Sequence, residues 1–266
     1  MGGWPRWNGF PWFGRERDPV RRVYAIGDIH GRLDLFERLL SIIQRDHAAR
    51  APTPTRIVVL GDLIDRGPDS ARVVEACRRF AEESDRFVVL KGNHEAIMLC
   101  ALSGDLLALE LWLKQGGREA LRSWGVVPEE LDRGPGVDLM EAARRAVGAE
   151  TLAWLSSLPL KLRHGNHLFV HAGIRPGAKL WRQTEDDLLW IRDEFLECEA
   201  DHGVIVVHGH TVHEAGPDIR HNRIGLDSGA WRTGRLSAVG IEDGQVWPLM
   251  TEPKPAARTA RSAAVA

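Results

Sequence analysis

Five short segments of this 266-residue chain carry aspartate, asparagine or histidine beside glycine, each directly after an apolar run. They are Gly27-Asp28-Ile29-His30-Gly31, Gly61-Asp62-Leu63-Ile64-Asp65-Arg66-Gly67, Gly92-Asn93-His94-Glu95, His171-Ala172-Gly173 and His208-Gly209-His210-Thr211. Carboxylates and imidazoles are metal ligands, and glycine permits the tight turns that bring a backbone close to ions or phosphate. The pattern is typical of strands that end in turns around a two-metal site.

The spacing within these segments places candidate ligands at one edge of a sheet. Asp28 and His30 are two residues apart at the end of the first predicted strand, so the period of two in a strand turns both side chains to the same side. Asp62 ends the second predicted strand, and Asn93 ends the third. Open α/β sheets place their sites at the carboxyl ends of strands, so we expect these residues to converge.

The candidate ligands differ in what each can bind. Asp62 has two carboxylate oxygens and is the candidate bridge between two cations, whereas Asn93 offers one neutral carbonyl to a single ion. His171 and one histidine of the pair His208 and His210 would complete the second ion's shell. Ligands of nitrogen and oxygen without thiolate admit Mn, Fe, Zn, Co or Mg, although imidazole disfavours an all-magnesium site.

Each segment also has a purely structural interpretation. A single histidine such as His171 is more often a buried or surface histidine than a ligand, and Asp65 and Arg66 could form a salt bridge within their own turn. His208 could lie beneath the site and hydrogen bond to a ligand. Five such segments at predicted strand ends are hard to explain as unrelated turns, so we favour the metal site.

Strands and helices alternate in the first half of the chain. Apolar runs predict strands at 22–26, 56–60 and 86–90, and helical spacing predicts helices over 33–45, 70–81 and 94–103. Continuous apolar strands separated by helices predict a parallel sheet that is buried on both faces.

The second half predicts another sheet, of mixed or antiparallel strands. We assign to it the strands expected at 160–163, 168–170, 204–207, 223–226, 236–241 and 245–249. Residues 105–157 between the halves have helical patterns and no Asp/His cluster, and we interpret them as a cap beside the site. The expected fold class is α/β, with one domain over residues 21–251 that contains two sheets and this helical cap insert.

Composition disfavours nucleic-acid-binding, membrane and disulfide-rich proteins. The chain has 35 Lys+Arg against 37 Asp+Glu, so no global field would recruit nucleic acid or an anionic membrane. Three cysteines without CxxC spacing disfavour a disulfide framework, and we expect reduced core thiols. Apolar stretches fall short of the roughly 20 residues that cross a bilayer, and no signal peptide is recognisable, so we expect a cytoplasmic protein.

The two ends of the chain differ from the rest. Residues 1–20 alternate five tryptophans and phenylalanines with Gly and Pro, and no regular element fits them. We expect an irregular aromatic arm packed across the domain, with a partner or membrane interface as the alternative. Residues 252–266 are rich in Pro, Ala and Arg, which predicts a disordered tail.

The segments resemble the phosphoprotein phosphatase branch of the calcineurin-like metallophosphoesterases. Gly-Asp-Ile-His-Gly, Gly-Asp-Leu-Ile-Asp-Arg-Gly and Gly-Asn-His-Glu are similar to its three signature blocks, and the order of segments is similar from Gly27 to Gly240. The later segments resemble bacterial and bacteriophage serine/threonine protein phosphatases and diadenosine tetraphosphatases; they are His171-Ala172-Gly173, Leu189-Trp190-Ile191-Arg192, Gly209-His210-Thr211 and Leu226-Asp227-Ser228-Gly229-Ala230. The resemblance implies a four-layer αββα fold, a two-sheet sandwich flanked by helices.

The same resemblance implies a dinuclear metal site. One metal would be bound by Asp28, His30 and Asp62, and the other by Asp62, Asn93, His171 and His210, where His210 is the histidine that matches Gly-His-Thr. Two divalent cations are implied, with manganese the expected metal. A metal-bridging hydroxide would attack phosphorus in line, and no covalent intermediate is needed.

Roles for the neighbouring residues also follow from the resemblance. His94 would protonate the leaving alkoxide, with Asp65 orienting its imidazole. Arg66 and Arg192 match phosphate-binding arginines, and Asn93 would contact the phosphate as well. A surface arginine is the simpler interpretation of Arg175, and His208 has no assigned role.

Three functions remain open at this point. The leading expectation is a metal-dependent phosphomonoester hydrolase, a serine/threonine protein phosphatase that could also accept phosphotyrosine. The first alternative is a nucleotide hydrolase similar to the diadenosine tetraphosphatases, because the same ligands serve both and the pocket beside them, shaped by residues 105–157, would differ. The second alternative is a noncatalytic partner-binding protein, which the complete ligand set disfavours. The expected partner is a phosphoprotein or a phosphorylated small molecule, with no nucleic acid and no membrane span.

Overall fold

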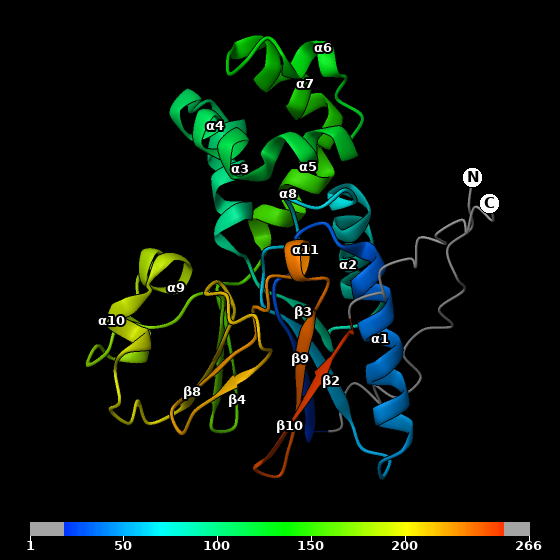
Figure 1. Cartoon of the computed structure of the whole chain (residues 1–266). Helices are drawn as coiled ribbons and strands as arrows, with labels where there is room; N and C mark the ends of the chain where they lie inside the picture. Colours follow the sequence, from blue (N-terminus) through cyan, green and yellow to red (C-terminus); the bar gives the residue numbers. More distant parts are fainter. Residues whose placement is uncertain (1–18, 253–266) are drawn as a thin grey trace, which may run out of the picture.

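Two sheets face each other within residues 19–252, the part of the chain that the computed structural model describes (Figure 1). The expected aromatic arm and C-terminal tail lie outside this part, apart from their inner ends. The first sheet has the order β10-β9-β1-β2-β3, with β1 (Arg22–Ile26), β2 (Thr55–Val59), β3 (Phe87–Val89), β9 (Ser237–Glu242) and β10 (Gln245–Met250).

The first sheet is parallel at its centre and antiparallel at one side. Strands β1, β2 and β3 run parallel, as predicted. The assignment of residues 236–249 to the second sheet is wrong, because β9 pairs antiparallel with β1 and β10 pairs with β9. Both faces of β9 are covered, since Ala238 packs under the helices while Val239 and Ile241 pack between the sheets.

The second sheet is mixed, which confirms that expectation. Its order is β4-β5-β6-β8-β7, with β4 (Lys161–His164), β5 (His167–Val170), β6 (Ile205–His208), β8 (Arg223–Gly225) and the unpredicted β7 (Asp218–Ile219). Strands β5, β6 and β8 run parallel, while β4 and β7 are antiparallel edges.

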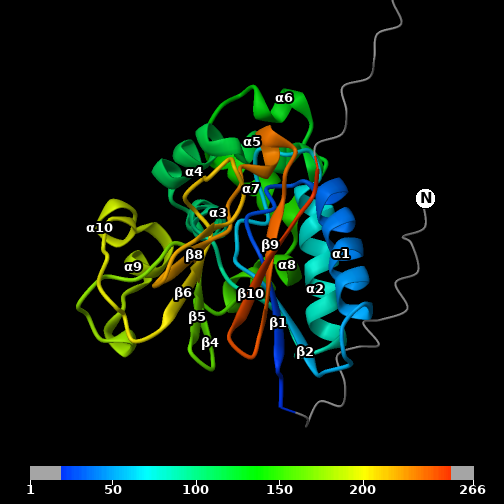
Figure 2. The same cartoon turned by 60° about the horizontal axis from the view of Figure 1, so that its bottom comes forward.

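Side chains alternate between the layers. In β1, Val23 and Ala25 pack between the sheets, whereas Tyr24 and Ile26 pack against helices. The first sheet is covered by α1 (Leu33–Ala48) and α2 (Ser70–Glu83), and the second by α9 (Glu185–Trp190) and α10 (Asp193–Leu196), as Figure 2 shows. This is the expected four-layer arrangement of helices, sheet, sheet and helices.

Further helices stand above the carboxyl ends of the strands (Figure 1). They are α3 (Asn93–Ser103), α4 (Leu106–Trp112), α5 (Arg118–Ser123), α6 (Pro128–Leu131), α7 (Val137–Val147) and α8 (Ala149–Ser157), and the short α11 (Ala230–Thr233) lies below them. Helix α3 packs against α4, α7 and α8, so the helical segment 106–157 shares the core of the first sheet.

Two composition-based expectations can be compared with the structure. Among the described residues, no helix has the length and apolar character that crossing a membrane requires. All three cysteines are free, but only Cys77 is a core thiol: Cys100, in α3, is exposed and Cys198, which follows α10, is partly exposed.

Candidate active site

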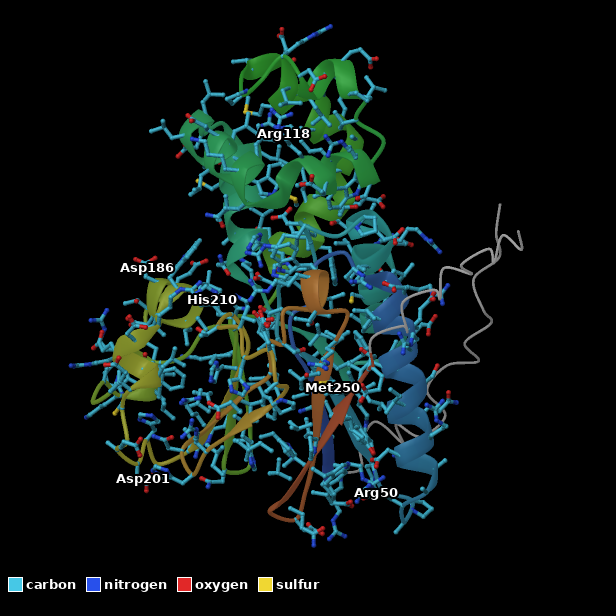
Figure 3. All side chains as sticks on the ribbon, viewed as in Figure 1. Arg50, Arg118, Asp186, Asp201, His210 and Met250 are labelled. Atoms are coloured by element: carbon cyan, nitrogen blue, oxygen red, sulfur yellow. The ribbon has the colours of Figure 1, made fainter. Side chains whose placement is uncertain are left out.

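Strand ends from both sheets bring the candidate ligands together. The loops after β1, β2 and β3 carry three of the segments, and the ends of β5 and β6 carry the other two. Figure 3 shows His210 between the sheets and the cap. The six residues expected to bind metal converge there and are all buried: Asp28, His30, Asp62, Asn93, His171 and His210.

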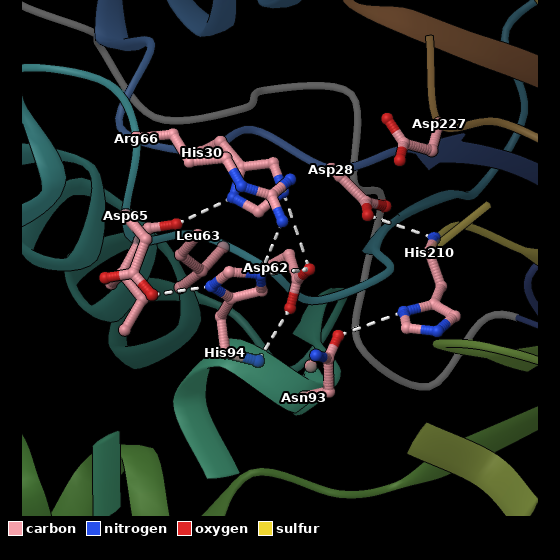
Figure 4. Close-up of polar contacts among 12 residues, drawn as sticks. Asp28, His30, Asp62, Leu63, Asp65, Arg66, Asn93, His94, His210 and Asp227 are labelled. Carbon is pink, nitrogen blue, oxygen red and sulfur yellow. Dashed lines mark hydrogen bonds and ion pairs between the residues drawn. The ribbon is translucent and has the colours of Figure 1, made fainter. Parts of the chain in front are cut away.

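Asp62 lies at the centre, with its two oxygens turned to different partners (Figure 4). Its Oδ2 is 3.5 Å from Nε2 of His30, and its Oδ1 is 3.5 Å from Nε2 of His171. Ligand atoms form two groups within 4.8 Å, one of His30, Asp62 and His94 and one of Asp62, His171 and His210. A carboxylate shared by both groups is what a bridge between two cations requires.

Backbone carbonyls fix the orientation of two imidazoles. Nδ1 of His30 donates to Ile64 O at 2.8 Å, and Nδ1 of His171 donates to Leu60 O at 2.9 Å. A neutral imidazole that donates through Nδ1 keeps a lone pair on Nε2. Both Nε2 atoms therefore face Asp62 as ligand atoms.

Asn93 completes the group around His171. Its Oδ1 is 2.8 Å from Nε2 of His171 and 3.0 Å from Nδ1 of His210. Burial lowers the pKa of His171, so its Nε2 carries a lone pair that faces the lone pairs of the asparagine oxygen. Acceptor atoms that converge in this way fit a shared cation.

Buried carboxylates give the site a local excess of negative charge. Asp28, Asp62 and Asp227 are each at most 2% exposed. Burial, followed by the charges of Asp227 and Asp62, raises the pKa of Asp28 well above its usual value, and burial raises the pKa of Asp227 to about 6. Buried charges need partners, and cations would supply them.

Asp28 differs from the other candidate ligands. It belongs to neither of the two groups of ligand atoms, and its Oδ2 accepts the backbone N–H of His210 at 3.0 Å. Its Oδ1 is buried and has no hydrogen-bond partner among the described residues. Asp28 lies near Asp62 and Asp227 (Figure 4), and a cation would be the natural partner of its free oxygen.

The backbone of the site is unusual. Five of its non-glycine residues have positive φ, namely His30 (45°), Asp62 (47°), Asp65 (74°), Arg66 (67°) and His210 (63°). Such conformations cost on the order of 1–3 kcal/mol each and tend to cluster at functional sites. Gly209 allows one close approach, because a Cβ there would lie 2.0 Å from Oδ1 of Asp28.

Glu95 holds two of the loops together. Its Oε2 accepts N–H groups of Asp62 at 2.9 Å and Gly92 at 2.8 Å, and its Oε1 accepts the N–H of Leu63 at 2.9 Å. Burial, followed by the charge of Asp62, raises its pKa to about 7. Glu95 therefore has a structural role: its hydrogen bonds join the loops that carry Asp62 and Asn93.

His94 belongs to a chain of hydrogen bonds that reaches the cap. Its Nδ1 donates to Oδ2 of Asp65 at 2.5 Å, and its Nε2 accepts from Nη2 of Arg66 at 2.9 Å. Burial lowers the pKa of His94, but the charges of Asp62 and Asp65 outweigh it and the net shift is upward. Asp65 and Arg66 make no salt bridge with each other among the described residues, since each is used by other partners.

An open pocket of about 730 Å³ lies beside this chain of hydrogen bonds. Cationic residues dominate its charged lining: Arg66, Lys114, Arg118, Arg192 and Arg232, against the single acid Glu119. Trp231 adds an indole that is 39% exposed and lies 5.6 Å from the Arg66 guanidinium. The pocket suits an anionic ligand.

Arg175 and His208 make contacts outside the proposed ligand set. Arg175 binds Asp187 through Nη2 at 2.6 Å and does not line the pocket. His208 is buried against Phe195, with 5.1 Å between ring centroids, and its Nδ1 donates to Gly209 O at 3.0 Å. His208 thus lies beneath the site.

Sequence reasoning missed Trp112, Glu95 and Asp227 as parts of the site. Glu95 and Asp227 stand inside the quoted segments, so proximity to the motifs was an available signal. Trp112 had none, because it lies 47 positions from Asp65 in an apolar helix.

Comparisons with known proteins identify the family and several named relatives. The family described as calcineurin-like phosphoesterase matches residues 21–232. "Serine/threonine-protein phosphatase 1" of Salmonella typhimurium is 28% identical over 229 residues, which cover 84% of this chain and 93% of the relative. A symmetrical bis(5'-nucleosyl)-tetraphosphatase of Acidovorax sp. is 32% identical over 158 residues, but these cover 58% of this chain and only 44% of the relative.

Solved structures share the fold at low identity. A structure described as a candidate diadenosine tetraphosphatase has a TM-score of 0.59 at 24% identity and covers 88% of this chain and 97% of its own. A cold-active protein-tyrosine phosphatase of a psychrophilic Shewanella has a TM-score of 0.57 at 17% identity and covers 86% and 77%. With its two facing sheets and the family match over residues 21–232, the chain belongs to the calcineurin-like phosphoesterases, a metal-dependent family of hydrolases.

Proposed function

We propose that this protein is a phosphomonoesterase that acts on phosphoserine and phosphothreonine in proteins, with phosphotyrosine as a further substrate. The observation that carries the proposal is Asp62, whose oxygens face two groups of ligand atoms beside an open cationic pocket. A relative named as a serine/threonine-protein phosphatase, matched over 93% of its length, supports this substrate class.

The ligand set suits two divalent cations. Asp28, His30 and Asp62 would hold one ion, and Asp62, Asn93, His171 and His210 the other. We favour manganese, the metal that the family resemblance implies; the oxygen and imidazole ligands also admit Fe, Zn, Co or Mg. When bound, the pair would supply Lewis acidity and a water activated for in-line attack on phosphorus.

Residues around the ions would perform the remaining steps. Arg66 and Arg192 line the pocket and would hold the phosphate oxygens, and Asn93 would contact the phosphate as well. In its protonated form, His94 would give the proton on Nε2 to the leaving alkoxide, with Arg66, which donates to that nitrogen in this structure, turned to the phosphate. Asp65 accepts from Nδ1 and so keeps the imidazole in that orientation.

The pocket also supports a second candidate, a dinucleoside polyphosphate hydrolase. Lys114, Arg118 and Arg232 lie beyond the two arginines assigned to the reacting phosphate, and they could meet further phosphates. The exposed face of Trp231 could stack on a base, a contact worth about 1–3 kcal/mol. The relative named as a tetraphosphatase supports this alternative.

A substrate panel separates the candidates. Turnover of a phosphoserine peptide, p-nitrophenyl phosphate and diadenosine tetraphosphate is measured with Mn, Zn, Fe, Co and Mg, and with two variants. These are His94→Asn and the control His221→Asn, whose histidine is exposed and does not line the pocket. We expect turnover of the peptide, a fall of roughly 100-fold or more in kcat for His94→Asn, and no change for His221→Asn. A preference for the dinucleotide by orders of magnitude would overturn the assignment. Bound metal with no activity on any phosphoester would favour the noncatalytic alternative.

A further inference from the structure

Trp112, in the cap, donates a hydrogen bond to Asp65, the partner of the candidate proton donor His94. It is the last residue of α4 and is fully buried. Its indole Nε1 donates to Oδ1 of Asp65 at 2.9 Å and to Oδ2 at 3.1 Å. The same Oδ2 accepts from His94, so tryptophan, aspartate and histidine form one buried chain of hydrogen bonds (Figure 4 shows its Asp65–His94 part).

The turn after Trp112 holds the neighbouring backbone as well. Gly116 O accepts the N–H of Arg66 at 3.4 Å, and a Cβ on Gly116 would lie 2.5 Å from that nitrogen. Gly117 packs on the indole, because a Cβ there would lie 2.8 Å from the ring. Residues 112–117 therefore hold the side chain of Asp65 and the backbone of Arg66 in place, and both of these residues have positive φ.

The two contacts to Asp65 restrict how its carboxylate can turn. A carboxylate rotates easily about its last torsion, which is broad rather than staggered. Hydrogen bonds from two different side chains fix the plane of the group. Without the indole N–H, Oδ1 would be a buried oxygen with no other side-chain donor among the described residues. Only the bond from His94 would then restrain the orientation of the carboxylate.

We infer that Trp112 is a positioning residue for proton transfer: it fixes the Asp65 carboxylate so that His94 presents Nε2 to the leaving oxygen. This inference rests on the proposed function. A water oxygen forms a new bond to phosphorus as the O–P bond to the leaving alkoxide breaks, the proton on Nε2 of protonated His94 moves to the departing alkoxide oxygen, and Asp65 stays ionised throughout. Trp112 touches neither substrate nor metal in this role.

The leaving group distinguishes positioning from a general loss of structure. An alkoxide such as serine needs a proton as it leaves, whereas p-nitrophenolate is a stable anion and leaves without one. Trp112→Phe keeps the apolar bulk and removes the N–H. We expect kcat to fall about ten-fold for a phosphoserine peptide, less than three-fold for p-nitrophenyl phosphate, and KM to stay within about two-fold for both.

Trp154→Phe is the matched control. Trp154 packs on the same core from α8, and its indole N–H makes no bond to a carboxylate among the described residues. It should leave both substrates unaffected. If Trp112→Phe does not fold, site-specific replacement of Trp112 by benzothienylalanine, in which sulfur replaces N–H in a ring of similar shape, tests the same expectation.

A double variant tests whether the effect of Trp112→Phe on kcat acts through His94. In a His94→Asn background, Trp112→Phe should leave the residual kcat unchanged, because residues that act through one step are not additive. Equal losses on both substrates, or full activity of Trp112→Phe on the peptide, would overturn the inference while His94→Asn remains impaired. Absence of wild-type activity on every phosphoester would instead count against the proposed function.

Discussion

At the scale of single residues, the site contains buried acids and strained backbone conformations, which cost free energy of folding. Asp28, Asp62 and Asp227 are buried acids, and one oxygen of Asp28 has no partner among the described residues. Positive φ at His30 and His210 adds backbone strain. A fold retains such features where they perform a task, and binding cations would neutralise the acids.

Asp227 should strengthen metal binding without being a proposed ligand. It is near Asp28 and accepts the N–H of Gly229 at 2.8 Å through Oδ1. Asp227→Asn removes a negative charge at nearly constant size, so we expect metal affinity to fall about 10-fold, a usual effect for groups that support ligands. Calorimetric titration with Mn measures it, and the exposed Asp243→Asn is the control. Unchanged affinity would show that Asp227 has only a structural role.

At the scale of elements, predictions succeeded where the signal was local. Helix α1 was predicted at 33–45 and extends over Leu33–Ala48, because apolar residues repeat on one face. Strand β1 matches its predicted bounds. The partner of β9 was missed, since antiparallel pairing with β1 joins residues more than 200 positions apart and leaves no periodic mark in either strand.

The junction of β1, α1 and β2 contains a histidine that should make stability depend on pH. Nδ1 of His47 accepts from Nη1 of Arg22 at 2.9 Å. Burial, followed by the charge of Arg22, lowers the pKa of His47 to about 4. The folded state thus favours the neutral ring, so its contribution is complete above the unfolded pKa of about 6.5 and is lost as pH falls toward 4.

We therefore expect His47→Gln to reduce the loss of stability in mild acid. Glutamine can accept from Arg22 without taking up a proton. Between pH 7 and pH 5, the free energy of unfolding of the wild type should fall by about 1–2 kcal/mol more than that of the variant, after allowance for partial solvent screening. Urea unfolding at both pH values measures the difference. Parallel declines in the two proteins would mean that His47 does not carry the effect.

At the scale of the whole molecule, the strand-end motifs located most of the side chains that converge at the site, because a parallel sheet brings its strand ends to one edge. Asn93 and His171 lie 78 positions apart, yet each could be picked out from its own segment. Trp112 could not be found in this way. Its link to Asp65 depends on how the cap packs on the first sheet, and an apolar helix carries no sign of which carboxylate it will meet.

Metal binding should stabilise the whole domain, because the site joins both sheets and α3. The candidate ligands come from loops after β1, β2 and β3 and from the ends of β5 and β6, so unfolding any layer would release the ions. At a metal concentration 100 times Kd, one site adds about 2.7 kcal/mol. For a domain of this size, that corresponds to a rise in Tm of roughly 5–10 °C. Thermal unfolding after treatment with a chelator, and again after adding Mn, measures the rise. Asp62→Ala should abolish it, whereas Asp243→Asn should retain it; an equal rise in the Asp62→Ala variant would place the stabilising ions elsewhere in the molecule.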